Sequence, residues 1–247
     1  MVKPDFPVNS IAQRRQFRFH VRRLKRTFFI TGTDTGVGKT VLTALLTRFL
    51  RGCGVNAVAL KPFCSGGRAD ARELRAAMGG TLSLDETNPW HFRAPIAPLL
   101  AARREQKRVH LAEVLTHVRA MQKRFDALLV EGAGGLLSPL GEDFNSRDLI
   151  LALRATLLVV AQNRLGVANQ LLLTLEALPG NFRCDAKLVL MSPPKPDAST
   201  RANAGLLAEF LDRGRIFALP WFGESISAGE ALTNPRVQRT LRALSGA

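Results

Sequence analysis

The residues best suited to chemistry gather between positions 31 and 40, in the run Thr-Gly-Thr-Asp-Thr-Gly-Val-Gly-Lys-Thr. Gly36 and Gly38 lack a Cβ, so the backbone can turn its N–H groups inward toward the oxygens of a phosphate. Lys39 adds a full positive charge, and the hydroxyl of Thr40 is a ligand suited to Mg²⁺. The spacing departs from the standard pattern, because five residues instead of four separate the first glycine from Gly38. We predict a loop that binds the phosphates of a nucleotide.

The sequence on either side of this loop supplies the strand and the helix that such a loop needs. An apolar run at 28–31 precedes it, and the apolar residues of 41–46 follow it at helical spacing. The first turn of a helix presents free N–H groups and a partial positive charge, which favour an anion. The setting therefore strengthens the prediction made from the glycines and the lysine.

Short apolar runs alternate with helical patterns along most of the chain. The predicted strands are 28–31, 56–61, 127–131, 156–161, 187–192 and 216–220. The predicted helices, with apolar residues three and four apart, are 38–51, 110–124, 166–177 and 200–212. Unbroken apolar strands indicate burial on both faces, as in a parallel sheet covered by helices. We predict a doubly wound α/β fold with a mostly parallel sheet, whose ligands bind at the carboxyl ends of the strands.

The positive charge is concentrated at the beginning of the chain. The net charge of the 247 residues is +15, and residues 1–26 hold eight Lys and Arg against one acidic residue. We expect a basic, flexible extension over 1–26 and a single domain over 27–247. An anchor or an arm that binds polyanions remains the alternative for the extension, because clustered positive charge attracts phosphates.

Composition excludes several other classes of protein. Hydrophobic residues make up 46% of the chain, which is globular composition and excludes disorder over most of its length. The three cysteines form no CxxC pair and no plausible disulfide framework. The long apolar stretch 149–161 is interrupted by Arg154 and is too short to cross a membrane. We expect a cytoplasmic protein with no membrane partner and no specific nucleic acid partner.

Six short segments in residues 27–222 form a recognisable series. They are Gly32–Thr40, Lys61–Gly66, Asn88–Trp90, Glu131–Gly135, Leu165–Asn169 and Pro220–Phe222. In this order they resemble the motifs of the dethiobiotin synthetases, the ATP-dependent ligases of biotin synthesis. The resemblance implies a fold of the P-loop NTPase type, a homodimer, and a requirement for ATP and Mg²⁺. The implied substrates are 7,8-diaminononanoate and CO₂.

The reaction that the resemblance implies moves negative charge among oxygen atoms. An amine forms a carbamate with CO₂, and a carbamate oxygen attacks the γ-phosphate of ATP. The resulting carbamic–phosphoric anhydride is closed to a cyclic urea by the second amine, which expels phosphate. Fixed positive charge and positioning are what a protein can add to such chemistry.

The resemblance also implies roles for individual residues. Catalysis falls to Lys39 and Lys61, and metal binding to Thr40, Asp70 and Glu131. ATP binding falls to Thr35, Gly36, Val37, Gly38, Lys39, Thr40, Val41, Asp70, Glu131, Gly132, Ala133, Gly134, Met191, Ser192, Pro220, Trp221 and Phe222. Substrate binding falls to Lys61, Ser65, Leu165, Gly166 and Asn169, the last three partly across a dimer interface.

Several of these assignments have ordinary structural alternatives. Lys61 could be a solvated charge at a strand end, and Ser65 a plain turn residue. Asp70 could cap the predicted helix 71–77, since Asp is common at that position. Glu131 is harder to explain otherwise, because a carboxylate directly after an apolar strand is a poor core residue.

The sequence departs from the family pattern at two positions. Gly36 stands where some relatives carry an acidic residue near the substrate amine. Met191 stands where the family commonly has an Asn that reads the adenine edge, and a thioether cannot make those hydrogen bonds. Ser192 or backbone groups would then have to read the base. We therefore expect relaxed selectivity for the base of the nucleotide.

A second class of function fits the same fold. A partition or septum-positioning ATPase is a nucleotide switch that would use the basic charge to bind DNA or membrane. Its loop usually carries an extra lysine near the start, and positions 33–37 contain none. The ligase is the favoured interpretation.

Overall fold

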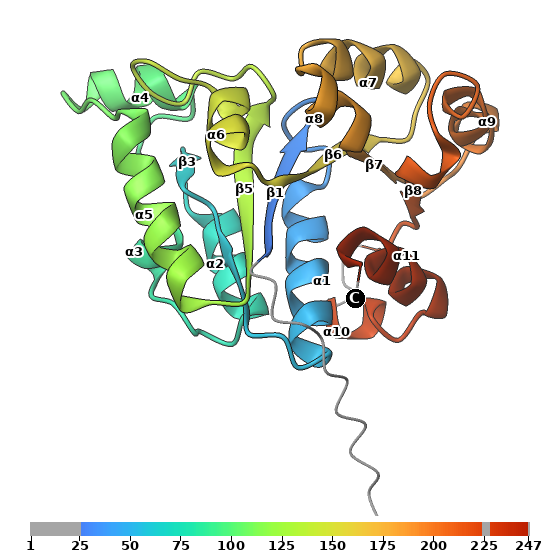
Figure 1. Ribbon diagram of the computed structural model, residues 1–247, viewed down its shortest axis with the longest axis horizontal. Coiled ribbons are helices and arrows are strands. Elements are labelled where there is room, and N and C mark those ends of the chain that lie inside the picture. Colours follow the sequence, from blue (N-terminus) through green and yellow to red (C-terminus); the bar gives the residue numbers. More distant parts are fainter. Residues whose placement is uncertain (1–25, 224–227, 247) are drawn as a thin grey trace, which may run out of the picture.

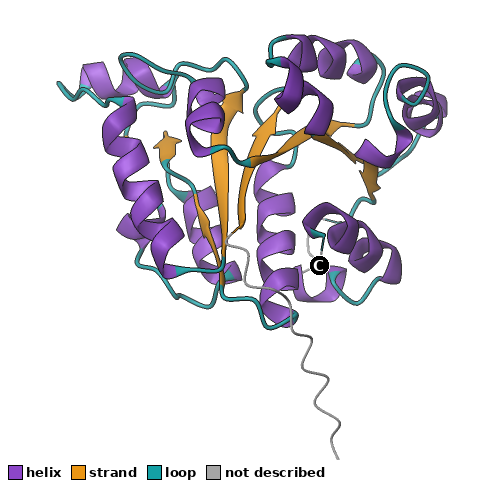
Figure 2. Ribbon diagram, in the orientation of Figure 1, coloured by secondary structure: helices purple, strands orange, loops and turns teal. Residues whose placement is uncertain are grey.

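The computed structural model describes residues 26–223 and 228–246 (Figures 1 and 2). Residues 1–25 of the predicted extension therefore lie outside the described part of the chain. Arg26 opens the first strand, β1 (Arg26–Gly32), one residue before the predicted domain start. Its backbone N–H donates to the carbonyl of Asp126 at 2.9 Å, and its guanidinium donates to the carbonyl of Ser245 at 2.6 Å. Arg26 thus has a structural role at the amino-terminal end of β1.

Six parallel strands form the central sheet, which confirms the predicted α/β fold. The strands other than β1 are β2 (Ala57–Leu60), β5 (Ala127–Gly135), β6 (Thr156–Gln162), β7 (Lys187–Met191) and β8 (Ile216–Leu219). Their spatial order is β2-β5-β1-β6-β7-β8. The chain winds outward in both directions from β1, and all carboxyl ends meet at one edge of the sheet.

Helices cover both faces of this sheet (Figure 1). One face packs against α5 (Leu111–Arg124), α6 (Ser146–Leu153), α7 (Val167–Glu176) and α9 (Ala198–Leu207). The other face packs against α1 (Lys39–Gly52), α2 (Ala69–Ala77), α10 (Ala228–Ala231) and α11 (Pro235–Ser245). The remaining helices are α3 (Leu84–Thr87), α4 (Pro98–Arg104) and α8 (Gly180–Asp185). Within the described ranges, no helix is both long enough and apolar enough to span a bilayer.

Strand β5 is longer than predicted, because it continues beyond the predicted end at residue 131. The sheet continues through Gly135, which pairs with Gly32 after a register shift between β5 and β1. A Cβ at Gly135 would lie 3.4 Å from the carbonyl oxygen of Gly32, so the two strands are in van der Waals contact at this point. The extra strand residues run directly beside the phosphate loop.

A second, two-stranded parallel sheet was not predicted. It pairs β3 (Phe63–Ser65) with β4 (Trp90–Phe92). Three-residue strands carry no periodicity that a sequence pattern could show. Phe63 stacks on Trp90 with their ring centroids 5.4 Å apart. This contact joins the segment Lys61–Gly66 to the segment Asn88–Trp90.

Candidate active site

The phosphate loop adopts the conformation that its glycines predict. Gly36 and Gly38 have positive φ angles of 72° and 97°, a backbone conformation that residues other than glycine rarely adopt. Gly38 is the N-cap of α1, and no side chain caps this end of the helix. The first N–H groups of α1 are therefore left for a ligand, and the helix dipole favours a negative one.

Lys39 lies buried beneath this loop. Its Nζ donates a hydrogen bond of 2.6 Å to the carbonyl oxygen of Asp34, within the same loop. Burial, and then the nearby charge of Lys61, lowers the pKa of Lys39 to about 8. A phosphate placed beside the ammonium would favour the charged form. Lys39 can therefore hold the loop closed on itself or turn its charge toward an anion.

Lys61 is the centre of a buried charge cluster. Its Nζ donates to Glu131 Oε1 at 2.6 Å and to the carbonyl oxygen of Gly132 at 2.9 Å. Asp70 Oδ2 lies 3.3 Å from the same nitrogen, and Thr40 Oγ1 donates to Glu131 Oε1 at 2.8 Å. Lys61 is 5% exposed and Glu131 1% exposed, so the alternative of a solvated strand-end charge is wrong for Lys61.

The cluster keeps Lys61 positively charged. Burial acts to lower the pKa of Lys61, but the carboxylates of Glu131 and Asp70 outweigh it and raise the pKa above its ordinary value. A permanent cation in a site screened from water interacts strongly with a developing negative charge. The arrangement suits stabilisation of anionic oxygens more than proton transfer.

Two polar residues hold Lys61 and its neighbours in place. The buried Asn88 donates to the carbonyls of Lys61 and Pro62 at 2.7 and 3.2 Å. Arg68 donates to Asn88 Oδ1 at 3.0 Å and is the residue that precedes α2. The sequence singled out Asn88 only as part of a motif and did not single out Arg68, because no local pattern pairs residues twenty positions apart.

Asp70 takes part in the cluster and does not cap a helix. The N-cap of α2 is Arg68, and Asp70 lies in the first turn, where a carboxylate is favoured by the helix dipole. Its oxygen points toward Lys61. The capping alternative is therefore wrong.

The oxygens of this cluster fit a hard divalent cation. Thr40, Asp70 and Glu131 are the oxygen-bearing side chains, and Glu131 Oε2 is buried with no hydrogen-bond partner in the described structure. Mg²⁺ binds through one or two carboxylates and completes its shell with phosphate oxygens and water. In the described ranges, no group of three or more His, Cys, Asp and Glu side chains is arranged to hold a metal. The geometry thus suits a cation shared with a phosphate.

A cavity of about 850 Å³ opens above the cluster. Its lining includes most of the residues predicted to hold phosphates and substrate: Thr35, Gly36, Gly38, Lys39, Thr40, Val41, Lys61, Ser65, Asp70, Glu131, Ala133 and Gly134. The Ser65 hydroxyl is buried and has no hydrogen-bond partner in the described structure. A buried hydroxyl without a partner is costly unless a ligand bonds to it. Gly132 does not line this cavity and takes part through its carbonyl.

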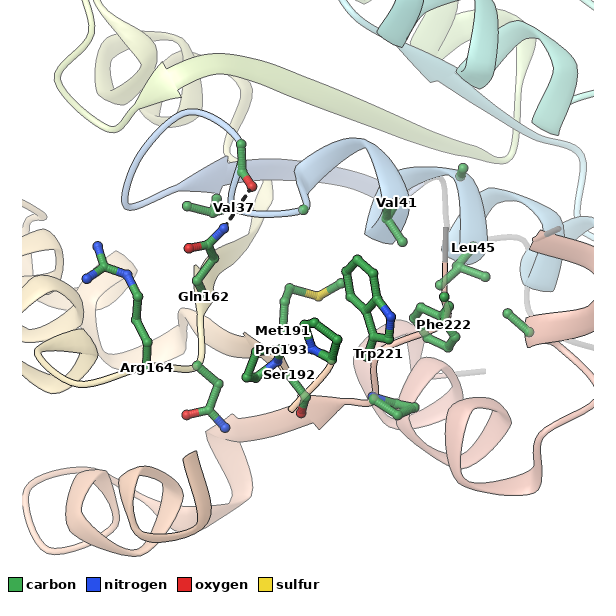
Figure 3. A pocket seen from close by; sticks show the side chains of 18 of the residues that line it. Val37, Val41, Leu45, Gln162, Arg164, Met191, Ser192, Pro193, Trp221 and Phe222 are labelled. Atoms are coloured by element: carbon green, nitrogen blue, oxygen red, sulfur yellow. Dashed lines mark hydrogen bonds between the residues drawn. The ribbon is translucent and has the colours of Figure 1, made fainter. Parts of the chain in front are cut away.

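A second cavity of about 490 Å³ lies on the other side of the phosphate loop (Figure 3). Its lining includes the other residues predicted for the nucleotide: Val37, Met191, Ser192, Pro220, Trp221 and Phe222. Figure 3 shows Val41 and Leu45 of α1 facing the ring of Trp221. The walls are mainly apolar, which suits a flat heterocyclic base.

The polar side chains around this second cavity are partly committed to other contacts. Asn163 Nδ2 donates to the carbonyl of Thr200 at 3.0 Å, and Asn163 Oδ1 accepts from Asn203 at 2.8 Å. Gln162 donates to the carbonyl of Gly36 at 3.3 Å. Met191 lies so close to Gly38 that a Cβ there would be 3.0 Å from Met191 Cγ. Met191 therefore packs on the loop as an apolar wall.

Three predicted substrate residues lie away from both cavities. Leu165, Gly166 and Asn169 are in the turn before α7 and in its first turn, and all are exposed. Leu165 is 79% exposed, which is a high exposure for a large apolar side chain. The structure of one chain does not bring these residues to the phosphate loop.

Comparison with known proteins agrees with the motifs. Residues 26–226 match a family described as an AAA domain. An ATP-dependent dethiobiotin synthetase BioD from Anaeromyxobacter dehalogenans (strain 2CP-C) is 44% identical over 201 residues, covering 79% of this chain and 90% of the relative. A protein of the same name from Akkermansia muciniphila is 40% identical over 188 residues, covering 76% and 88%.

Among solved structures, a ParA family ATPase from Chlorobium tepidum TLS has a similar fold. The TM-score is 0.55 at 11% sequence identity, and the match covers 90% of this chain and 98% of the other. At this identity the likeness concerns the fold alone.

Proposed function

The chain belongs to the dethiobiotin synthetase family of ATP-dependent ligases, and we propose that it joins CO₂ to 7,8-diaminononanoate and closes the product to a cyclic urea. ATP is converted to ADP and phosphate in this reaction. The observation that carries the proposal is the cluster of Lys61, Glu131, Asp70 and Thr40 in one cavity with the phosphate loop. That cavity joins a place for a triphosphate to a place for a second reactant.

The first half of the proposed reaction makes and activates a carbamate. One amine of the diamine attacks CO₂, loses a proton and becomes a carbamate. A carbamate oxygen then attacks the γ-phosphorus, and the bond to ADP breaks. Lys61 and Lys39, which line the same cavity, supply positive charge to the transferred group, and the N–H groups at the start of α1 hold the phosphates.

The second half closes the ring. The neighbouring amine attacks the carbonyl carbon of the anhydride, and phosphate leaves with the carbamate oxygen that it received. Ser65 would hold the reactant through its unpartnered hydroxyl. Thr40, Asp70 and Glu131 would hold Mg²⁺, which neutralises charge on the phosphates when bound. These residues position charged groups in one cavity.

We also propose that the working unit is a homodimer. The family resemblance assigns Leu165, Gly166 and Asn169 to substrate binding, yet all three are exposed in one chain. Leu173, on the same helix α7, is also 62% exposed. A second copy packed on this apolar surface would bring the turn before α7 to its partner's cavity. Sedimentation velocity is expected to give twice the mass of one chain, and a monomer that is fully active would contradict the proposal.

The experiment that tests the function supplies diamine, bicarbonate, ATP and Mg²⁺ and measures the cyclic urea by mass spectrometry. Product formation with one ADP released per urea is the expected result. Parallel reactions replace diamine and bicarbonate with DNA or with anionic lipid vesicles. ATP hydrolysis stimulated by DNA or vesicles, without urea formation, would instead support the nucleotide switch.

The apolar base cavity predicts weak discrimination among nucleotides. Met191 offers no hydrogen bond to a base, and the amide of Asn163 is committed to Thr200 and Asn203. We expect GTP and CTP to support the reaction within about a hundredfold of ATP in kcat/KM. Met191→Asn is the matched variant and should increase the preference for ATP. Rejection of both alternatives by more than about a hundredfold, about 2.7 kcal/mol, would mean that another group reads the base.

A further inference from the structure

The two cavities meet along the beginning of α1. Four residues line both of them: Gly36, Gly38, Val41 and Glu73. The first three belong to the phosphate loop and α1, whereas Glu73 comes from α2. A ligand that extends from one cavity into the other passes this side chain.

Glu73 lies on the face of α2 that is turned toward the site. It follows Asp70 by three residues, a spacing that puts two side chains on the same side of a helix. Asp70 points to Lys61. Glu73, Asp70 and Glu131 line the same cavity. Partial burial, followed by the charges of Asp70 and Glu131, raises the pKa of Glu73.

The carboxyl group of Glu73 is free of intramolecular contacts of the polar kind within the described residues. The neighbouring Arg75 donates to the carbonyl of Leu82 instead, and Arg68 pairs with Asp85. Glu73 makes no hydrogen bond or ion pair with another described residue, in contrast to Asp70 and Glu131. Its oxygens are therefore available to a ligand.

The chemistry of a nucleotide decides which group fits there. With the phosphates on the loop and the base in the apolar cavity, the ribose lies where the two cavities meet. A carboxylate beside a phosphate is unfavourable because the charges repel, but a carboxylate accepts hydrogen bonds from sugar hydroxyls. A hydrogen bond to a charged group is among the stronger ones.

From this juxtaposition we infer that Glu73 binds the ribose hydroxyls of the nucleotide and selects ribonucleotides over deoxyribonucleotides. The inference rests on the proposed use of ATP and adds the residue that reads its sugar. Nothing in the sequence pattern pointed to Glu73, because an acidic residue on an exposed helix is ordinarily a solvated charge.

The test is a binding cycle that combines protein and ligand changes. Calorimetry measures ATP, 2′-deoxy-ATP and 3′-deoxy-ATP with Mg²⁺, without diamine or bicarbonate, on the full chain. We expect wild-type protein to bind at least one deoxy analogue about tenfold more weakly than ATP. Glu73→Ala should bind ATP about tenfold more weakly and lose no further affinity with that analogue, because the two changes remove the same contact.

Arg72→Ala is the control, since Arg72 is an exposed neighbour on the same helix and lines neither cavity. This variant should discriminate between ATP and the deoxy analogues as wild-type protein does. Equal binding of all three ligands by wild-type protein, or unchanged discrimination by Glu73→Ala, would overturn the inference and leave the proposed function intact. Failure of wild-type protein to bind ATP at all would overturn both.

Discussion

Replacing Lys61 with alanine is expected to lower the rate of cyclic urea formation by a factor of about 10² to 10³. This is the typical effect of removing one preorganised charge from a site that stabilises an anionic transition state. Lys61 is buried and held by Glu131 and Gly132, so solvent cannot replace its charge. Single-turnover measurements of urea formation give the rate, and calorimetry gives ATP affinity, which should change much less.

The design must separate a lost charge from a damaged fold. Removing one partner of a buried ion pair leaves the other uncompensated and typically costs about 3–5 kcal/mol. Lys61→Met fills the volume better and should show the same loss of rate with a smaller loss of thermal stability. Lys107→Ala removes a surface lysine that pairs with Glu105 and should behave as wild type. A folded Lys61→Met variant with near-normal turnover would remove Lys61 from the mechanism.

The parts of the fold that could be predicted are those with a strong local signal. Each strand of the central sheet is a buried apolar run, and the predicted and observed bounds differ by two residues or fewer except at the end of β5. The predicted strand stops at residue 131 because glycines are rare in strands. The observed strand continues because Gly135 pairs with Gly32 of β1, a contact between distant segments.

The parts that could not be predicted depend on contacts between distant segments. Arg68 and Asn88 position Lys61 through backbone carbonyls, and no spacing rule reveals such a contact. Asp70 was ambiguous for the same reason, since a helix cap and a site carboxylate share one sequence signature. Glu73 gave no signal at all, because only the meeting of two cavities distinguishes it from a solvated acid.

The likeness to a ParA family ATPase and the motifs of a ligase are compatible, because fold and function are separable. In this chain, a second charged layer accompanies the phosphate loop. Lys61 directly follows β2, and Glu131 lies in the neighbouring strand β5. Both residues line the cavity that the loop also lines, where the proposed second reactant would bind.

Glu131 connects Lys61 to the proposed metal position. It accepts from both Lys61 and Thr40, and its second oxygen has no hydrogen-bond partner in the described structure. Its charge is the main influence that raises the pKa of Lys61 against the opposing effect of burial. Glutamine at this position keeps the shape and one carbonyl oxygen but removes the charge.

Glu131→Gln is therefore expected to change two measurements at once. The Mg²⁺ concentration for half-maximal urea formation should rise by at least about tenfold, as losses near metal sites typically do. Because the larger of the two influences that raise the pKa of Lys61 is gone while burial remains, the pKa of Lys61 falls. Activity should then be lost at a lower pH than in the wild type as pH increases. Glu113→Gln, on α5 and outside both cavities, is the control. An unchanged Mg²⁺ titration would count against Glu131 as a metal ligand, and an unchanged alkaline limit would show that Lys61 does not depend on it for its charge.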